Sequence, residues 1–267
     1  SFFDSILKIT SSMAKATFRF YAELNHFLPS SKKQVNFAYF FEERASIKDT
    51  IESLGVPHPE VAFMEVNGEW VDFSYLVQDG DEINVYPISI APEITPIICV
   101  QPQPLDVPRF VLDIHLGKLA TSLRLLGFDT LYRNDYADEE LAKVSDTCQR
   151  ILLTRDKGLL MRSLVTYGYY VRSTNPDTQI VEVLQRFNLF DSVIPFHRCL
   201  RCNGLLEPVE KELILEKLPE SVKLHVQEFH RCSDCQQIYW RGSHYERMQQ
   251  YIERVLGAKI ERYFNTG

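Results

Sequence analysis

The chain has 267 residues, of which 45% are hydrophobic and 24% are charged, and its formal net charge at pH 7 is −7. This length predicts two or three domains, and the hydrophobic content excludes a wholly disordered chain. The acidic balance excludes a generally basic nucleic-acid coat protein. The acidic excess is local, because residues 1–95 carry 7 Lys and Arg against 14 Asp and Glu, whereas residues 96–267 carry 22 of each.

No segment of the sequence has the length and hydropathy expected of a transmembrane helix. The most apolar stretch, residues 94–100, is interrupted by proline and is far shorter than the roughly 20 residues that a span needs. The first 14 residues lack the basic start and long apolar run of a secretory signal. We therefore expect a cytoplasmic protein.

Residues 15–87 have the pattern of a small α+β domain. Apolar residues alternate as in half-buried strands, for example at Phe18 and Phe20, and Ser46 is a typical helix cap. An Asn67-Gly68 pair predicts a hairpin. The expected elements are strands at 17–21, 35–39, 61–66 and 82–86 and a helix at 47–54. This β-β-α-β-β order resembles the ubiquitin-like β-grasp fold.

The end of this first domain, D-G-D-E-I-N-V-Y-P at residues 79–87, resembles the end of the sulfur-carrier branch of that fold. Sulfur carriers require a free Gly-Gly terminus, and the sequence contains no Gly-Gly. We therefore interpret the domain as an acidic interaction or packing module. Six of the 13 prolines fall within residues 87–108, which predicts an extended linker at 88–108.

Residues 109–195 have the alternating pattern of an α/β domain. The expected strands are 109–112, 128–132, 150–154 and 168–172, and the expected helices are 116–126, 138–148, 156–164 and 177–187. Strands that alternate with helices predict a parallel sheet with helices on both faces. In such sheets the functional site lies beyond the carboxyl ends of the strands.

Acidic residues occur where these strands end or where the following helices begin: Asp113, Asp138 with Glu139, Asp156 and Asp177. Aspartate is also a preferred helix cap, so each of the last three Asp residues could have only that role. Asp113 is different, because it follows an apolar strand where an isolated carboxylate is costly. Clustered carboxylates call for a cation, and Mg²⁺ or Mn²⁺ prefers such oxygen ligands. These ions can activate water for phosphodiester hydrolysis.

Three cations, Lys118, Arg124 and Arg155, lie close to these acids in the sequence. They could hold phosphate groups of RNA near the metal, or they could be ordinary solvated helix residues. The domain contains no G-x-G-x-x-G, no P-loop and no G-x-S-x-G motif. Nucleotide-binding and nucleophile-elbow chemistries are therefore disfavoured.

Two C-x-x-C pairs predict a structural zinc site formed by Cys199, Cys202, Cys232 and Cys235. Four thiolates leave no open coordination position, so this zinc is not expected to be catalytic. We assign residues 196–247 to a zinc ribbon, with a helical segment near 210–218, and residues 248–267 to a C-terminal helix or tail. Cys99 and Cys148 have no assignable role.

The predicted ribbon carries cationic and aromatic residues that suit single-stranded RNA. The candidates for RNA contact are Arg201, Arg241 and His244. His244 could equally be a capping or packing residue. For Trp240 we expect packing in the small ribbon core.

The strings F-V-L-D-I-H-L-G-K-L-A at 110–120, N-D-Y-A-D-E-E-L at 134–141 and R-I-L-L-T-R-D-K-G-L-L at 150–160 resemble a PIN-like ribonuclease family. This family is found with a fused zinc ribbon at the C-terminus of mut-seven-type exonucleases. The resemblance implies that Asp113, Asp138 and Asp156 are the metal-binding acids, with Glu139 beside them; Asp177 matches less closely. Family members often carry Arg-Trp where this chain has Thr121 and Ser122.

Three functions remain open from the sequence. The first is a metal-dependent endoribonuclease that hydrolyses phosphodiester bonds in RNA at the Asp cluster, using Mg²⁺ or Mn²⁺. The second is an RNA-binding protein that holds tRNA or rRNA without cutting it, which the neutral C-terminal part favours. The third is an adaptor whose acidic β-grasp domain recruits a protein partner.

Overall fold

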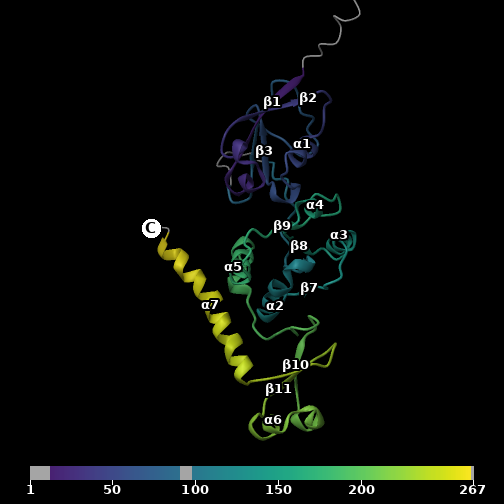
Figure 1. The fold of residues 1–267 in the computed structure, drawn as a ribbon, viewed down its shortest axis with the longest axis vertical. Helices are drawn as coiled ribbons and strands as arrows, with labels where there is room; N and C mark the ends of the chain where they lie inside the picture. Colours follow the sequence, from purple (N-terminus) through teal and green to yellow (C-terminus); the bar gives the residue numbers. More distant parts are fainter. Residues whose placement is uncertain (1–12, 91–97, 266–267) are drawn as a thin grey trace, which may run out of the picture. The chain divides into compact units, whose positions relative to one another are not determined.

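The computed structural model describes residues 13–90 and 98–265, and the side chains of the last helix up to residue 258 (Figure 1). The expectations for residues 1–12 and for part of the linker, residues 91–97, lie outside this range. The chain packs as two compact units. Unit 1 contains Ser1–Pro104 together with Asp156–Tyr169, and unit 2 contains Leu105–Arg155 together with Tyr170–Gly267.

Unit 1 is built on a mixed five-stranded sheet with the order β2-β1-β5-β3-β4 (Figure 1). The strands are β1 (Ala14–Phe20), β2 (Phe37–Phe41), β3 (Phe63–Val66), β4 (Glu69–Trp70) and β5 (Glu82–Tyr86). The central strand β1 is antiparallel to β2 and parallel to β5. This arrangement confirms the predicted mixed-sheet domain, and the sheet adds one short strand, β4, to the predicted set.

The turns of unit 1 follow from residue types that the sequence shows. Helix α1 (Ile47–Ser53) is capped by Ser46, whose Oγ accepts a hydrogen bond from the Asp49 amide at 3.0 Å. The Asn67-Gly68 hairpin between β3 and β4 has positive φ at both residues, as the predicted turn requires. The core is aromatic and aliphatic, with Phe18, Ile51 and their buried neighbours almost fully shielded from solvent. Short 3-10 helices complete the module: η1 (Ala22–Phe27), η2 (Ser30–Lys32) and η3 (His58–Glu60).

The segment 156–169 packs with the β-grasp module, although it follows the α/β strand β8 (Ile151–Thr154) in sequence. His58 is the main link, since its Nε2 donates to the Val165 carbonyl at 2.8 Å and its Nδ1 pairs with Glu52 Oε1 at 2.5 Å. Tyr167 donates its hydroxyl hydrogen bond to the Gln103 carbonyl at 3.0 Å.

These contacts correct one predicted element. The helix expected at 156–164 is a single turn, α4 (Lys157–Leu160). The chain then turns so that Val165, which is fully buried, can present its carbonyl to His58. A continuous helix would instead have used that segment's backbone groups internally.

We predict that His58→Leu loosens the segment 156–169. The substitution leaves the buried Val165 carbonyl without its partner, and Glu52 keeps only the hydrogen bond from the backbone amide of residue 58. An unsatisfied buried group costs about 1–3 kcal/mol. Hydrogen exchange of the amides of residues 163–166 should accelerate, and the urea midpoint should fall. The same substitution at the exposed His225 is the control; equal protection of residues 163–166 in both variants would contradict the assigned role.

Unit 2 contains the α/β domain. Its sheet has the order β7-β6-β8-β9, and the central strand β6 is parallel to both β7 and β8. The strands are β6 (Phe110–Leu112), β7 (Thr130–Leu131), β8 (Ile151–Thr154) and β9 (Gly168–Tyr170), the last of which spans the boundary between the units. The helices are η4 (Ile114–Leu116), α2 (Gly117–Leu125), α3 (Asp138–Thr147), α5 (Pro176–Arg186) and η5 (Phe190–Ser192).

The helices lie on both sides of the sheet, as predicted: α3 and α5 are seen on opposite sides of the strands, and α2 packs against α5 (Figure 1). Strand β7 is shorter than the expected 128–132. Gly127, with φ of +95°, ends α2, and the Phe128 amide still bonds back to the Leu123 carbonyl, so the strand begins only afterwards.

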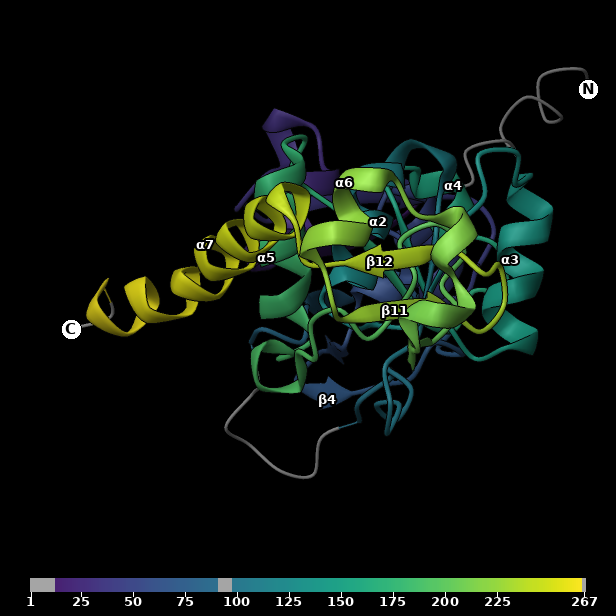
Figure 2. The ribbon, with the colours of Figure 1, turned by 90° about the horizontal axis from the view of Figure 1, so that it is seen from below.

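The C-terminal part of unit 2 is an antiparallel three-stranded ribbon with the order β10-β11-β12 (Figure 2). Its strands are β10 (Leu206–Val209), β11 (Phe229–Cys232) and β12 (Ile238–Trp240). The insert between β10 and β11 forms the short turns η6 (Lys211–Leu213) and η7 (Leu215–Lys217) and the helix α6 (Glu220–His225). Trp240 packs on a small core that includes Ile214, Phe229 and Ile238, which confirms its expected packing role.

The last helix, α7 (Ser243–Asn265), begins earlier than the residue 248 expected from the sequence. Phe196 stacks on Tyr245 with ring centroids 4.4 Å apart, and Ser122 shares a 2.8 Å hydrogen bond with Tyr251. The first contact joins α7 to the segment that leads into the ribbon, and the second joins it to helix α2 of the α/β domain. Throughout the described parts of the chain, every helix is too short or too polar to cross a bilayer.

Candidate functional site

The four predicted cysteines converge at the base of the ribbon. Cys199 Sγ lies 3.6 Å from Cys235 Sγ, and Cys202 Sγ lies 3.4 Å from Cys232 Sγ. In the part of the chain that is described, this is the only group of three or more His, Cys, Asp or Glu residues whose ligand atoms lie within 4.8 Å of one another. One metal ion with tetrahedral preference fits such a set of four sulfurs.

The backbone around the thiols leaves no room for other side chains. A Cβ at Gly204 would lie 2.7 Å from both Cys232 Sγ and Asp234 Oδ2, so glycine is required there. Tyr239 bonds to Cys199 Sγ at 3.1 Å and also accepts a hydrogen bond from the Leu200 amide. Burial raises the pKa of the Cys199 thiol, but the Tyr239 hydroxyl and nearby backbone amides outweigh this and bring the pKa down to about 7.

Arg124 has a structural role instead of the RNA contact considered from the sequence. Its side chain is buried, with 5% of the residue exposed, and its guanidinium donates to the carbonyls of Thr130, Leu200 and Arg201. Burial lowers the pKa of this guanidinium, and the adjacent thiols of Cys202 and Cys199 oppose that shift. Arg124 therefore joins α2 and β7 to the first cysteine pair.

Asp129 forms a second connection between the sheet and the ribbon. Its Oδ1 accepts hydrogen bonds from Arg150 at 2.7 Å and from Asn203 Nδ2 at 2.8 Å, while Asn203 Oδ1 accepts from the Thr130 amide. Burial alone would raise the pKa of Asp129, but the bonds from Arg150 and Asn203 outweigh burial and hold this pKa below its usual value. This cluster has no signature in the sequence, because Asp129 and Asn203 are far apart in the chain and match no motif.

Asp113 lies directly after β6 at the carboxyl end of the sheet and is 6% exposed. Its Oδ2 accepts a 2.7 Å hydrogen bond from the Thr154 hydroxyl, and its Oδ1 accepts a 3.3 Å bond from the His115 amide. Within the residues that the structure describes, no Lys, Arg or His forms an ion pair with it. A buried carboxylate without a cation is costly, and a bound metal ion is one way to stabilise it.

The other predicted acids occupy different positions. Asp156 caps α4 by accepting from the amides of Gly158 and Leu159, so its capping role is present. Asp138 is the first residue of α3, where it makes no capping bond, and it is exposed together with Glu139. Asp177 is exposed in the first turn of α5, which Asn175 caps in its place.

Comparison with known protein families decides the classification. The model of the Mut7-C RNAse domain matches residues 108–252, which is more than half of the chain. The chain belongs to the Mut7-C RNAse domain family. A second model, the Mut7-C ubiquitin domain, matches residues 13–92, in agreement with the suspected mut-seven-type architecture. No curated protein and no solved structure matches the chain.

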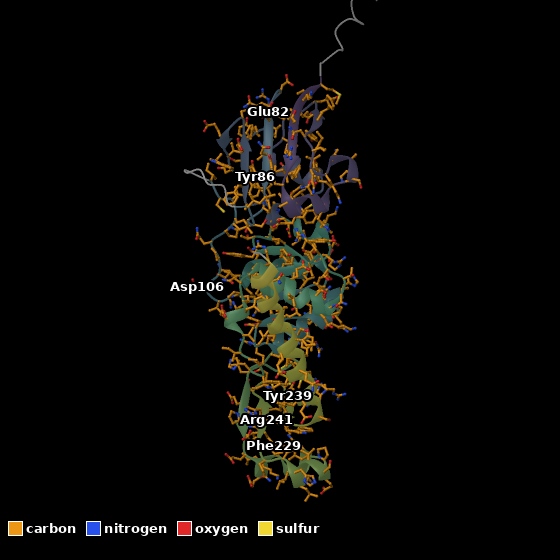
Figure 3. All side chains as sticks on the ribbon, turned by 90° about the vertical axis from the view of Figure 1, so that its left-hand side faces the viewer. Glu82, Tyr86, Asp106, Phe229, Tyr239 and Arg241 are labelled. Atoms are coloured by element: carbon orange, nitrogen blue, oxygen red, sulfur yellow. The ribbon has the colours of Figure 1, made fainter. Side chains whose placement is uncertain are left out.

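The remaining cations of this Mut7-C RNAse domain differ in how exposed their charged groups are and in which groups they contact. Lys118 and Arg201 are exposed, and no described residue holds their charged groups. Arg155 instead donates through Nη1 to the carbonyls of Val171, Arg172 and Ser173. Arg241, which is labelled in Figure 3, is exposed, and its Nε lies 3.8 Å from Oε2 of the exposed Glu228.

We predict that Cys232→Ser removes the metal from this Mut7-C RNAse domain. The substitution takes one of four sulfurs from a closed site, so zinc in the purified protein should fall from about one ion per chain to nearly none. The backbone amides of the ribbon should also lose protection against hydrogen exchange, because metal binding and folding are coupled. Elemental analysis measures the zinc, and the exposed Cys148→Ser is the matched control. Zinc retained at the control level in Cys232→Ser would contradict the site.

A second substitution tests the close packing at Gly204 and leaves all four cysteines in place. Gly204→Ala places a methyl group against Cys232 Sγ and should weaken zinc binding by about 10-fold or more. Gly257→Ala is the control, since nothing lies within 4 Å of a Cβ there. Competition with a chromogenic chelator measures both affinities, and equal affinities would show that the close approach is unimportant.

Proposed function

We propose that this Mut7-C RNAse domain is a PIN-like, metal-dependent endoribonuclease that hydrolyses phosphodiester bonds in RNA. The single observation that carries this proposal is the environment of Asp113: a buried carboxylate, at the carboxyl end of a parallel strand, that has a hydroxyl and an amide as partners but, among the described residues, no cation. Family membership supplies the reaction class.

In this proposal Asp113 and Asp156 hold a Mg²⁺ or Mn²⁺ ion, and Asp138 either ligates it or orients the attacking water. Their carboxylate oxygens have the chemistry that these ions prefer. A bound divalent ion would lower the pKa of water and stabilise the charge that develops on the phosphate. The Thr154 hydroxyl orients Asp113 so that its other lone pairs can face the ion. Glu139 and Asp177 are the neighbouring acids that could adjust this environment.

In this proposal the four cysteines and the exposed cations have separate roles. Zn²⁺ occupies the four cysteines and has a structural role, because the closed set leaves no position for substrate. RNA, which could be a tRNA or rRNA, contacts the exposed Lys118, Arg201, Arg241 and His244. We place the protein in the cytoplasm and retain the domain division at residues 87, 108, 195 and 247 proposed from the sequence.

One observation favours the second candidate function, RNA binding without cleavage. Asp156 already uses Oδ1 to cap α4, and the described acids do not form a compact group of ligand atoms like that of the cysteines. A domain of this kind could hold RNA through its exposed cations alone. The cleavage experiment below distinguishes the two functions.

We predict that Asp113→Asn and Asp156→Asn each reduce cleavage of a mixed RNA pool in Mn²⁺ by about 100-fold or more, because each removes a proposed metal-binding carboxylate. In Asp113→Asn the amide oxygen of the new side chain can still accept from Thr154, so the fold should persist. The exposed Asp146→Asn, which makes the same charge change, is the control and should cleave at the wild-type rate.

The outcomes of this experiment separate the candidates. Equal cleavage by the wild type and both variants would show that the acids are not catalytic. No cleavage by the wild type with any divalent ion, together with persistent RNA binding, would establish the non-cleaving function.

A further inference from the structure

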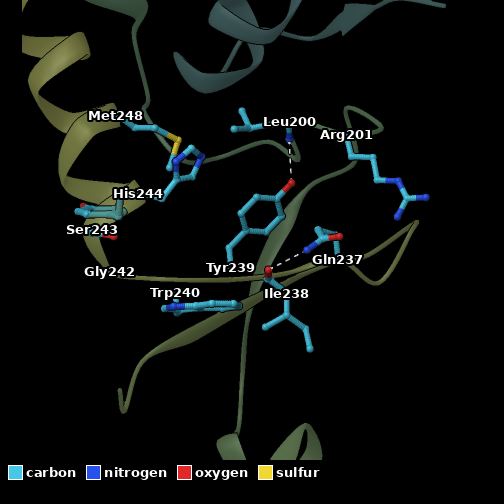
Figure 4. Close-up of a pocket in the computed structure, with 11 residues that line it drawn as sticks. Leu200, Arg201, Gln237, Ile238, Tyr239, Trp240, Gly242, Ser243, His244 and Met248 are labelled. Carbon is cyan, nitrogen blue, oxygen red and sulfur yellow. Dashed lines mark hydrogen bonds between the residues drawn. The ribbon is translucent and has the colours of Figure 1, made fainter. Parts of the chain in front are cut away.

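A large cavity lies between strand β12 and the first turns of α7 (Figure 4). Its volume is about 580 Å³, and its walls come from the first cysteine pair, the strand Ile238–Trp240 and the start of the helix. Tyr239 stands at its centre with the hydroxyl directed to the Leu200 amide (Figure 4). None of the acids proposed for catalysis lines this space, so it is separate from the proposed reaction site.

The cavity is a built feature of unit 2. The Phe196–Tyr245 stack attaches α7 to the segment that leads into the ribbon, and the Ser122–Tyr251 hydrogen bond attaches it to the α/β domain. On the opposite wall, Tyr239 is bonded to Cys199 and Leu200, so the cysteine site determines its position. Both walls therefore have fixed positions without a ligand. Less conformational entropy is then lost when a ligand binds.

The walls combine apolar surface with positive charge. Trp240, Tyr245 and Met248 supply the apolar surface, while Arg201 and His244 are the ionisable side chains besides tyrosine. Among the described residues, no Asp or Glu lines the cavity, although the chain has 36 of them. A zinc ion bound by four thiolates would leave net negative charge nearby, but the buried Arg124 guanidinium lies beside Cys199 and Cys202 and offsets part of it.

A smaller cavity of about 310 Å³ shares Tyr239, Trp240, Tyr245 and Met248 with the first. It adds Arg241 and His230, but also the carboxylate of Glu228. The Arg241 guanidinium carbon lies 5.5 Å from the centroid of the Tyr245 ring, which lines both cavities. Arg201 lines the larger cavity and Arg241 the smaller one, so each cavity combines apolar rings with one arginine.

We propose that the larger cavity binds one unpaired base of a single-stranded RNA, with Arg201 on the adjoining phosphate. Flat apolar walls accept any base through stacking, and a cation at the rim matches the backbone charge. A duplex cannot present a base in this way, because its bases are stacked and paired. This inference rests on the proposed function only in taking RNA as the ligand, and it assigns the ribbon the selection of single-stranded substrate.

The chain offers a direct optical test, because it has two tryptophans and only Trp240 lines the cavity. In the Trp70→Phe variant of the full chain, all tryptophan emission comes from Trp240. Titration with single-stranded oligo(U) and oligo(A) RNA, without added Mg²⁺ or Mn²⁺, should quench this emission to a saturating value. A blunt RNA duplex at the same nucleotide concentration should not.

Substitutions of residues that line the cavity measure what each side chain contributes to RNA affinity. Arg201→Gln should raise the Kd for the single strand by about 5–10-fold and reduce the salt slope by about one, because one phosphate contact is lost. His244→Ala should raise the Kd by about 5-fold or more by removing part of the wall. Arg247→Gln is the matched control, since Arg247 is exposed but outside both cavities, and its Kd should change less than about 2-fold.

Each contrary result has a distinct meaning. Binding of labelled RNA with unchanged Trp240 emission would place the RNA elsewhere and overturn the proposal, as would equal effects of Arg201→Gln and Arg247→Gln. A complete lack of RNA binding would overturn it as well and would favour a protein ligand. Quenching by a wild-type domain that cleaves nothing would support the cavity while refuting the ribonuclease, so the two failures are distinguishable.

Discussion

The ribbon of unit 2 is organised around four cysteine sulfurs that lie close together. Their separation by no more than 4.8 Å sets the two tight turns, the glycine at Gly204 and the position of Tyr239. The ribbon's own core is small, and the buried Arg124 joins the turn of the first cysteine pair to the sheet. The proposed base-binding cavity is a consequence, because its central wall is the strand that carries Tyr239.

The acidic positions obey a different constraint. Asp113 is buried at the end of β6, whereas Asp138 and Glu139 are exposed. Asp156 begins a segment that packs with the β-grasp module through His58 and Val165. The module is therefore more than an acidic appendage, since removing residues 1–95 would also remove the packing partner of the chain that follows Asp156.

Much of the fold was predictable from residue types that act locally. Ser46 caps a helix, Asn67-Gly68 makes a hairpin and Gly127 ends α2 because each satisfies nearby backbone geometry. Asp177 shows the limit of this reasoning: Asn175, two residues earlier, takes the cap, and the sequence offers two equally good candidates. The helix expected at 156–164 was too long because its end is determined by His58, which lies far away in the chain.

The sequence alone determined the family resemblance, the order of the elements and the grouping of the four cysteines, because these depend on spacing along the chain. Only the tertiary structure decided that Arg124 is buried beneath the cysteines, that Asp129 joins Arg150 to Asn203, and that a cavity opens beside Trp240. Each of these depends on residues that meet only after folding. Burial and hydrogen-bond partners are properties of the packed chain, so local sequence patterns do not predict them.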